Sequence, residues 1–266
     1  MIRSSWLSIL VALTSALLTA GPADAQQRPA DAQQRPRSGG ELVFLVPSEP
    51  PSYDGHREGT FGMVHPFAPF YNTLLRMDPT DKTGTRPIGD LAESWTIAPD
   101  GLTYTLKLRQ GVKFHDGSVM TSRDVKTSYD KIVFPGAGLI SMRKGAYHAV
   151  EAIQAPDAHT IVFRLKWPES SFLTNLASPY NWIFKADILA KDPRWHETNV
   201  MGTGAFKFVE HVKGSHVVAK KNPDYWDKGK PYLDGYRAIF MSSSSAQVAA
   251  IRAERAHIQF RSFSPA

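Results

Sequence analysis

The sequence predicts a mixed α/β fold. Two observations favour it: short apolar segments occur in pairs joined by turn residues, and segments with helical spacing of apolar residues lie between these pairs. A doubly wound parallel sheet would instead alternate single buried strands with helices, so that architecture is disfavoured. The chain has 266 residues, of which 42% are hydrophobic and 21% charged, so it can bury one large core or two smaller ones.

The basic residues are scattered, which disfavours nucleic acid as a partner. The formal net charge is +6, and an excess of this size would attract nucleic acid or anionic lipid if it were clustered. The short basic groups instead stand close to acids, as Lys220 and Lys221 do to Asp224. No aromatic RNA-binding motif, zinc finger or basic helix accompanies them, so we expect no nucleic-acid binding.

The N-terminus has the pattern of a secretory signal peptide. Arg3 precedes an apolar run over residues 6–20, which is too short for a comfortable transmembrane helix. Ala23-Asp24-Ala25 then supplies a small-x-small site, so residues 1–25 are predicted to be removed by cleavage after Ala25. A buried helix is disfavoured, because the run lacks a polar position every third or fourth residue. The chain contains no cysteine to carry a lipid anchor, so we expect a soluble periplasmic protein.

A duplicated segment follows, ADAQQRP at residues 23–29 and again at 30–36. It lacks apolar side chains larger than alanine apart from its prolines, so it cannot offset the entropy lost on ordering. Residues 26–40 are therefore predicted to form a disordered leader, with a second possible cleavage site after Ala32.

The globular part is predicted to begin with a buried strand over Glu41–Val46, an apolar run bounded by Gly40 and Pro47. The loop that follows, residues 47–62, is rich in proline and glycine and has a density of polar and aromatic groups suited to lining a site. These groups are Ser48, Glu49, Tyr53, Asp54, His56 and Arg57.

Helices and hairpins are expected to alternate along the rest of the chain. Apolar spacing predicts an amphipathic helix over residues 65–75, although Pro66 and Pro69 leave its start open. Alternating segments predict hairpins of residues 95–97 with 103–109, 150–155 with 160–165, and 205–212 with 216–220. Further strands are expected at 111–114, 236–240 and 258–260, and further helices near 171–176, 185–189 and 244–256.

One helix carries an N-terminal signal. Thr121 is the predicted N-cap, and Asp124 falls in the first turn, where the helix dipole favours a negative charge. Val125, Tyr129 and Ile132 follow at helical spacing, so this helix is expected to bury one face.

No arrangement of residues predicts catalysis. The chain lacks a cysteine nucleophile, a G-x-S-x-G elbow, an H-E-x-x-H motif and a G-x-x-x-x-G-K-[ST] loop. His115 and Asp116 before Gly117 indicate a turn, because no further ligands follow at fixed spacing, and we expect no metal and no cofactor. Glu93, Asp100 and Asp116 lie in one stretch, which leaves a secreted hydrolase as an alternative to solvated turn carboxylates.

Several of the predicted hairpins, turns and helices carry sequence motifs that together form one series. LAESW at residues 91–95, DGLTYTLKLR at 100–109, GVKFHDG at 111–117 and TSRDV at 121–125 together resemble the signature region of the peptide/nickel-binding family, family 5, of solute-binding proteins of ABC transporters. NPDYW at 222–226 resembles that family's N-x-x-Y-W block, and GTGAF at 202–206 resembles its GTGPY segment, with Ala205 in place of the usual proline.

The resemblance implies a periplasmic-binding-protein-like fold of type II, in which two lobes close on a ligand. Residues 41–50 and 169–266 are expected to form parts of the first lobe, and residues 51–168 an inserted domain of hairpins and helices. The second lobe, which the family builds from the later half of its chains, is expected to be absent here.

The resemblance also implies where a ligand would bind. We expect Ser48, Glu49, Pro50 and Asp54 from the loop after the first strand to contact it, with backbone groups pairing as an added strand does. Aromatic residues are expected to form walls of the cleft, with packing in the core as the alternative for each. These are Tyr71, Tyr129 and Trp182.

The function implied is that of the periplasmic substrate-binding component of an ABC importer. Such a protein captures peptides or similar small solutes and delivers them to membrane permease subunits, as a monomer and without enzymatic activity. The alternative is a truncated, binding-deficient remnant of a split gene. The ligand itself stays open, because similar scaffolds bind peptides, nickel chelates, opines and sugars.

Overall fold

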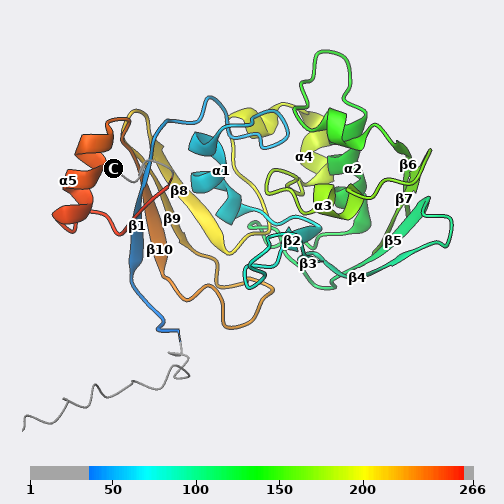
Figure 1. Cartoon of the computed structure of the whole chain (residues 1–266), viewed down its shortest axis with the longest axis horizontal. Helices are drawn as coiled ribbons and strands as arrows, with labels where there is room; N and C mark the ends of the chain where they lie inside the picture. Colours follow the sequence, from blue (N-terminus) through cyan, green and yellow to red (C-terminus); the bar gives the residue numbers. More distant parts are fainter. Residues whose placement is uncertain (1–35, 261–266) are drawn as a thin grey trace, which may run out of the picture. The chain divides into compact units, whose positions relative to one another are not determined.

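A computed structural model describes residues 36–260, and its largest sheet has five strands in the order β11-β1-β10-β9-β8. Strands β1, β8, β9 and β10 are labelled in Figure 1. The strands that form it are β1 (Glu41–Val46), β8 (Phe206–Val212), β9 (His216–Lys221), β10 (Gly235–Phe240) and β11 (Ile258–Gln259). β1 runs parallel to both of its neighbours, β10 and β11, whereas β8, β9 and β10 are antiparallel. The predicted buried first strand is thus confirmed as an inner strand of this sheet.

Two glycines bring the chain into β1. Gly39 donates its N–H to the carbonyl of Tyr232 at 2.8 Å, and Gly40 accepts from the N–H of Asp234 at 2.9 Å. Both glycines have positive φ angles, 103° and 82°, which L side chains rarely adopt. The predicted leader therefore ends in two residues that are hydrogen-bonded to the folded chain. The predicted signal peptide and the leader up to residue 35 lie outside the described residues.

The second sheet has four antiparallel strands in the order β4-β5-β7-β6. They are β4 (Ala92–Ile97), β5 (Thr103–Leu108), β6 (Val150–Asp157) and β7 (Thr160–Leu165), which confirms the two hairpins predicted from alternation. Tyr104, Leu106 and Leu108 of β5 are buried, because residues two apart face the same side of a strand.

Helix α2 (Ser122–Val133) packs against β6 and β7 of this sheet. Its N-cap is Thr121, as predicted, and the Asp124 carboxylate accepts the backbone N–H of Thr121 at 2.8 Å. One of the donors left unpaired by the helix start is thereby satisfied. Val125, Tyr129 and Ile132 are buried, as their spacing predicts.

The helix predicted over residues 65–75 is wrong in its bounds. The structure has α1 (Phe61–Phe67), then a 3-10 turn, η1 (Ala68–Phe70), and then extended chain that leads into β2 (Leu75–Met77). Pro66 and Pro69 lack the N–H groups that a continuous helix would need. β2 pairs with β3 (Pro87–Gly89), a small hairpin that the sequence analysis did not predict.

The short strand predicted at residues 111–114 is also wrong. This segment forms a single isolated bridge, between Lys113 and Val119. Gly117, with a φ of 88°, turns the chain back, and the Phe114 N–H bonds to the Ser118 carbonyl at 2.8 Å. The apolar signal came from Val112 and Phe114, which are buried without belonging to a sheet.

The remaining elements are short. They are η2 (Lys144–Tyr147), α3 (Phe172–Leu176), α4 (Ala186–Lys191), η3 (Trp195–Glu197) and α5 (Ser244–Arg252). Among residues 36–260, no helix combines the length and the apolar character needed to cross a membrane.

Two hydrophobic clusters form the core, and the chain over residues 180–184 contributes to both. Trp182 and Phe184 belong to the cluster around β1 and α1, whereas Ile183 belongs to the cluster between α2 and the four-stranded sheet. This alternation is what extended chain produces when both of its faces are buried.

Replacing Leu106 by alanine tests the second cluster. Leu106 is fully buried in β5, so Leu106→Ala should lower the free energy of unfolding by about 2–5 kcal/mol, measured by urea denaturation. The matched control is Glu93→Ala on neighbouring β4, which is exposed and should change stability by less than about 0.5 kcal/mol. Equal effects of the two variants would contradict the packing.

Candidate functional site

The first part of the loop after β1 is tied to the β8–β9 hairpin. The Glu49 carboxylate lies 2.9 Å from Nε2 of His211 and accepts the backbone N–H of Gly214 at 2.9 Å. Ser48 is exposed and Pro50 is buried. Glu49 is therefore positioned by the hairpin, while one of its neighbours faces solvent.

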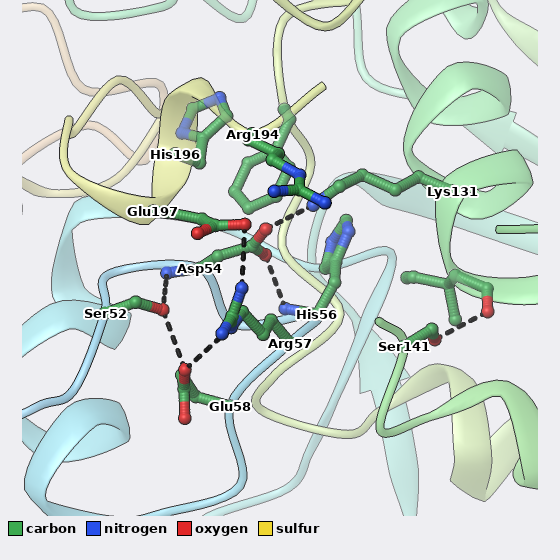
Figure 2. A network of polar contacts seen from close by, with 12 residues as sticks. Ser52, Asp54, His56, Arg57, Glu58, Lys131, Ser141, Arg194, His196 and Glu197 are labelled. Atoms are coloured by element: carbon green, nitrogen blue, oxygen red, sulfur yellow. Dashed lines mark hydrogen bonds and ion pairs between the residues drawn. The ribbon is translucent and has the colours of Figure 1, made fainter. Parts of the chain in front are cut away.

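Asp54 stands at the centre of a buried polar network (Figure 2). Its carboxylate forms an ion pair with Lys131 of α2, and both side chains are less than a tenth exposed. Asp54 also accepts the backbone N–H of His56 at 2.9 Å. The pair compensates two charges that would each be costly to bury alone, and it joins the loop to α2.

A partly exposed network continues from this pair (Figure 2). Arg57 contacts Glu197 at 3.0 Å and Glu58 at 3.4 Å, and Ser52 donates to Glu58 at 2.9 Å. The loop is thus held by charges at several positions.

Lys131 belongs to a stripe of buried polar residues on α2, with Asp124 and Ser128. Oδ1 of Asp124 accepts the N–H of Ala186 at 2.8 Å, and the hydroxyl of Ser128 accepts the N–H of Phe184 at 2.8 Å. Residues four and three apart lie on one face of a helix, so the spacing 124, 128, 131 was the signal for this stripe. The sequence analysis missed Lys131.

Two buried histidines lie beside the ion pair. Burial lowers the pKa of His56 well below its usual range, and the charge of Lys131 lowers it further. Burial likewise lowers the pKa of His196 to about 3, against a raising effect of Asp54. The His196 ring stacks on Phe184, with ring centroids 3.8 Å apart. Both histidines are therefore neutral near pH 7.

Tyr71 and Trp182 stack face to face, with ring centroids 4.4 Å apart and an angle of 3° between the planes. The Trp182 indole donates to the carbonyl of Pro179 at 2.7 Å. Both residues line a cavity of about 310 Å³ together with Asn72, Arg76 and Asp90, among others. The cavity combines aromatic walls with polar groups, as small-molecule sites do.

The polar groups of this cavity are fixed by each other. Asn72 donates to both carboxylate oxygens of Asp90, at 3.0 and 3.1 Å, and its own carbonyl accepts from Thr203 at 3.0 Å. Burial raises the pKa of Asp90, while the Thr73 N–H and Asn72 lower it in part. The carboxylate is thus a positioned hydrogen-bond acceptor.

Tyr129 lies in the second cluster, away from this cavity. It is fully buried and packs edge-on against Phe163 and Tyr147, with centroids 5.1 and 5.9 Å apart. Of the seven residues predicted to bind a ligand, Tyr71 and Trp182 share one cavity, Asp54 is in the ion pair, and Ser48, Glu49 and Pro50 lie in the loop. These roles stay predictions.

The carboxylates proposed for a hydrolase are not paired with one another. Burial raises the pKa of Asp116, but hydrogen bonds from Lys185 and Ser118 outweigh it and lower the pKa to about 2. Glu93 is exposed on β4 and Asp100 is exposed in a turn. Within residues 36–260, no group of three or more His, Cys, Asp or Glu side chains could hold a metal ion.

Solved structures share this fold. The periplasmic binding protein DppA from Helicobacter pylori, in complex with the peptide STSA, matches with a TM-score of 0.74 and 30% identity, over 83% of this chain and 46% of that one. AgaA from A. tumefaciens R10, in complex with agropinic acid, matches with a TM-score of 0.74 and 30% identity, over 82% and 43%. The prediction of a mixed α/β, periplasmic-binding-protein fold is confirmed, with coverage of each solved chain as expected for one lobe.

Comparison of the sequence indicates the same class of protein as comparison of the fold. Residues 86–264 match the model of the bacterial extracellular solute-binding proteins, family 5, and the chain belongs to this family. Di/tripeptide-binding protein 2 of Pseudomonas aeruginosa is 36% identical over 186 residues, which are 62% of this chain and 34% of that protein. The matched region thus spans about a third of the length of this relative and just under half of the solved chains.

Breaking the buried ion pair should destabilise the protein more than replacing both partners. Lys131→Met leaves the Asp54 carboxylate buried without its partner and should lower the free energy of unfolding by about 3–5 kcal/mol, whereas Asp54→Leu with Lys131→Met should recover much of this loss. Urea denaturation measures both. The control Lys126→Met breaks a half-exposed pair on the same helix and should cost less than about 1 kcal/mol.

His196 should make the protein less stable in mild acid. Its folded-state pKa of about 3 lies below the unfolded value of about 6.5, so the unfolded chain takes up the proton first. The stability contributed by the neutral His196 ring is fully present above pH 6.5 and is lost as the pH falls toward 3. Between pH 7 and pH 5, the free energy of unfolding measured by urea denaturation should therefore fall by about 1–2 kcal/mol less in His196→Phe than in the native chain. Equal losses would contradict this assignment.

Proposed function

We propose that this chain is the periplasmic substrate-binding component of an ABC importer, capturing peptides or similar small solutes and delivering them to membrane permease subunits. The observation that carries the proposal is membership of family 5, with a di/tripeptide-binding relative and structural neighbours solved with a peptide and with agropinic acid. No bond is made or broken in this role, and the protein acts as a monomer.

The division of the chain is part of the proposal. Residues 41–50 and 169–266 form parts of the first lobe, and residues 51–168 form its inserted domain. Residues 1–25 act as a signal peptide cleaved after Ala25, and residues 26–40 are the leader. Sequencing the N-terminus of the mature protein tests the export step: a start at Gln26 supports it, and an intact Met1 on protein recovered from the periplasm contradicts it.

We place the ligand contacts on Ser48, Glu49, Pro50 and Asp54, with Tyr71, Tyr129 and Trp182 as aromatic walls. The tie between Glu49 and the β8–β9 hairpin supports this for the loop, because a positioned loop presents its backbone groups to an extended ligand at little entropic cost. Tyr71 and Trp182 are supported by their shared cavity, whereas the buried position of Tyr129 favours packing.

Binding can be measured on protein purified from the periplasm. Mass spectrometry of small molecules released on denaturation should identify a bound peptide or similar solute. Adding that solute at about 100 times its Kd should raise the free energy of unfolding by about 2.7 kcal/mol, and Tm by about 5–10 °C. If the folded protein releases no solute and di- and tripeptides leave Tm unchanged, binding by this chain is rejected.

The alternative is a truncated remnant of a split gene. The matched region covers 34% of di/tripeptide-binding protein 2, and this partial coverage is the reason to test the alternative. The nucleotide sequence downstream of the Ala266 codon discriminates: a second lobe encoded in another frame, or in an adjacent reading frame, would support the remnant.

The hypothesis of a secreted hydrolase has less support, because the Asp116 carboxylate is paired with Lys185. It would require Glu93→Gln or Asp116→Asn to abolish a measurable turnover.

A further inference from the structure

A second cavity, of about 490 Å³, lies between the C-terminal end of α2, η2 and the start of β6. Its apolar lining comes from Val133, Phe134, Tyr147 and Val150. Phe134 is about half exposed, whereas the other three are buried core residues. The cavity therefore has a rigid apolar floor and one aromatic wall that is open to solvent, and we name it the α2–η2 cavity.

The polar lining of the α2–η2 cavity is basic. Lys144, His148 and Lys166 are among the residues that line it, and none of its lining residues is Asp or Glu. Asp130, one turn before Phe134 on α2, is already paired with Lys126 at 2.6 Å. A cavity with two lysines and no carboxylate in its lining attracts anions.

The hydrogen bonds of these basic residues leave donors for a ligand. Lys166 donates to the carbonyl of His148 at 3.3 Å, and an ammonium group has three N–H donors. Nδ1 of His148 lies 2.9 Å from the carbonyl of Gly145, which fixes the ring and leaves Nε2. Lys144 is exposed, so its ammonium group is accessible to a ligand.

The helix end beside the cavity is capped, which removes part of its repulsion for anions. The last carbonyls of a helix carry partial negative charge. The Ser141 hydroxyl donates to the carbonyl of Ile132 at 2.7 Å, and the Phe134 N–H donates to the carbonyl of Asp130 at 2.8 Å. Two carbonyls of the last turn are thus satisfied by the chain itself.

We propose that the α2–η2 cavity binds a small amphipathic anion, with its charged head between Lys144 and Lys166 and its apolar chain against Phe134 and the floor. A purely inorganic anion would leave the apolar lining unused, and an uncharged hydrocarbon would leave the ammonium groups unpaired. A volume of about 490 Å³ lies in the range of small-molecule sites. None of the residues that line this cavity belongs to the loop after β1, and the proposal does not depend on the proposed transport function.

Calorimetric titration of the purified protein with decanoate, below its micellar concentration, tests the site. Decanoate should bind, acetate should not, and each methylene removed from the chain should weaken binding about fourfold. Decylammonium has the same chain with the opposite charge and should bind at least about tenfold more weakly. Equal binding of decanoate and decylammonium would overturn the proposal.

Charge reversal locates the head group. Lys144→Glu with Lys166→Glu should weaken decanoate binding about 10- to 100-fold. The matched control is Lys82→Glu with Lys228→Glu, which changes the net charge equally at two exposed lysines outside this cavity and should leave binding unchanged. Equal loss in both double variants would show non-specific attraction and overturn the site.

A third variant tests the apolar wall without altering charge. Phe134→Ser replaces the apolar ring by a small polar side chain and should weaken decanoate binding while leaving Tm within a few degrees, since Phe134 is half exposed. A parallel sedimentation experiment with phosphatidylglycerol vesicles distinguishes a soluble ligand from a membrane surface. Binding to vesicles without binding to monomeric decanoate would overturn the proposal.

Discussion

The ion pair between Asp54 and Lys131 connects the two parts of the core. Asp54 comes from the loop after β1, and Lys131 ends a polar stripe on α2 that also holds the chain at Phe184 and Ala186. Because isolated buried charges are costly, neither side chain tolerates the loss of its partner. The loop, α2 and the segment at residues 180–184 therefore take up one arrangement, and the Tyr71–Trp182 stack forms within it.

The segment at residues 180–184 shows how this arrangement serves a binding site. Trp182 packs into the cluster around β1, whereas Ile183 packs into the cluster under α2. Extended chain with both faces buried has little freedom to move. The aromatic ring that lines the cavity of about 310 Å³ is thus mounted on a fixed wall, while the groups beside it, Asn72 and Asp90, are fixed by hydrogen bonds.

Local patterns predicted most of the elements, and contacts between distant residues account for what they missed. Alternation over Tyr104, Leu106 and Leu108 was sufficient for β5, and Thr121 with Asp124 was sufficient for the start of α2. The apolar spacing around Phe70 and Leu75 fitted a helix, but these residues face two different clusters from turn and extended chain. The spacing of Asp124, Ser128 and Lys131 indicated a shared face of α2, but the partner of Lys131 lies 77 residues away, and local spacing does not identify so distant a partner.

The position of β1 has a consequence for how the chain folds. β1 lies between β10 and β11, so its partners on both sides come from the last part of the described chain, and the bond between Gly40 and Asp234 spans 194 residues. Closing so long a loop is costly in entropy and slow. Until residues 235–240 are available, Phe44 and Val46 stay uncovered on a strand with free edges. The largest sheet is therefore completed late in folding. Until then, the exposed edges of β1 can pair wrongly with other chains.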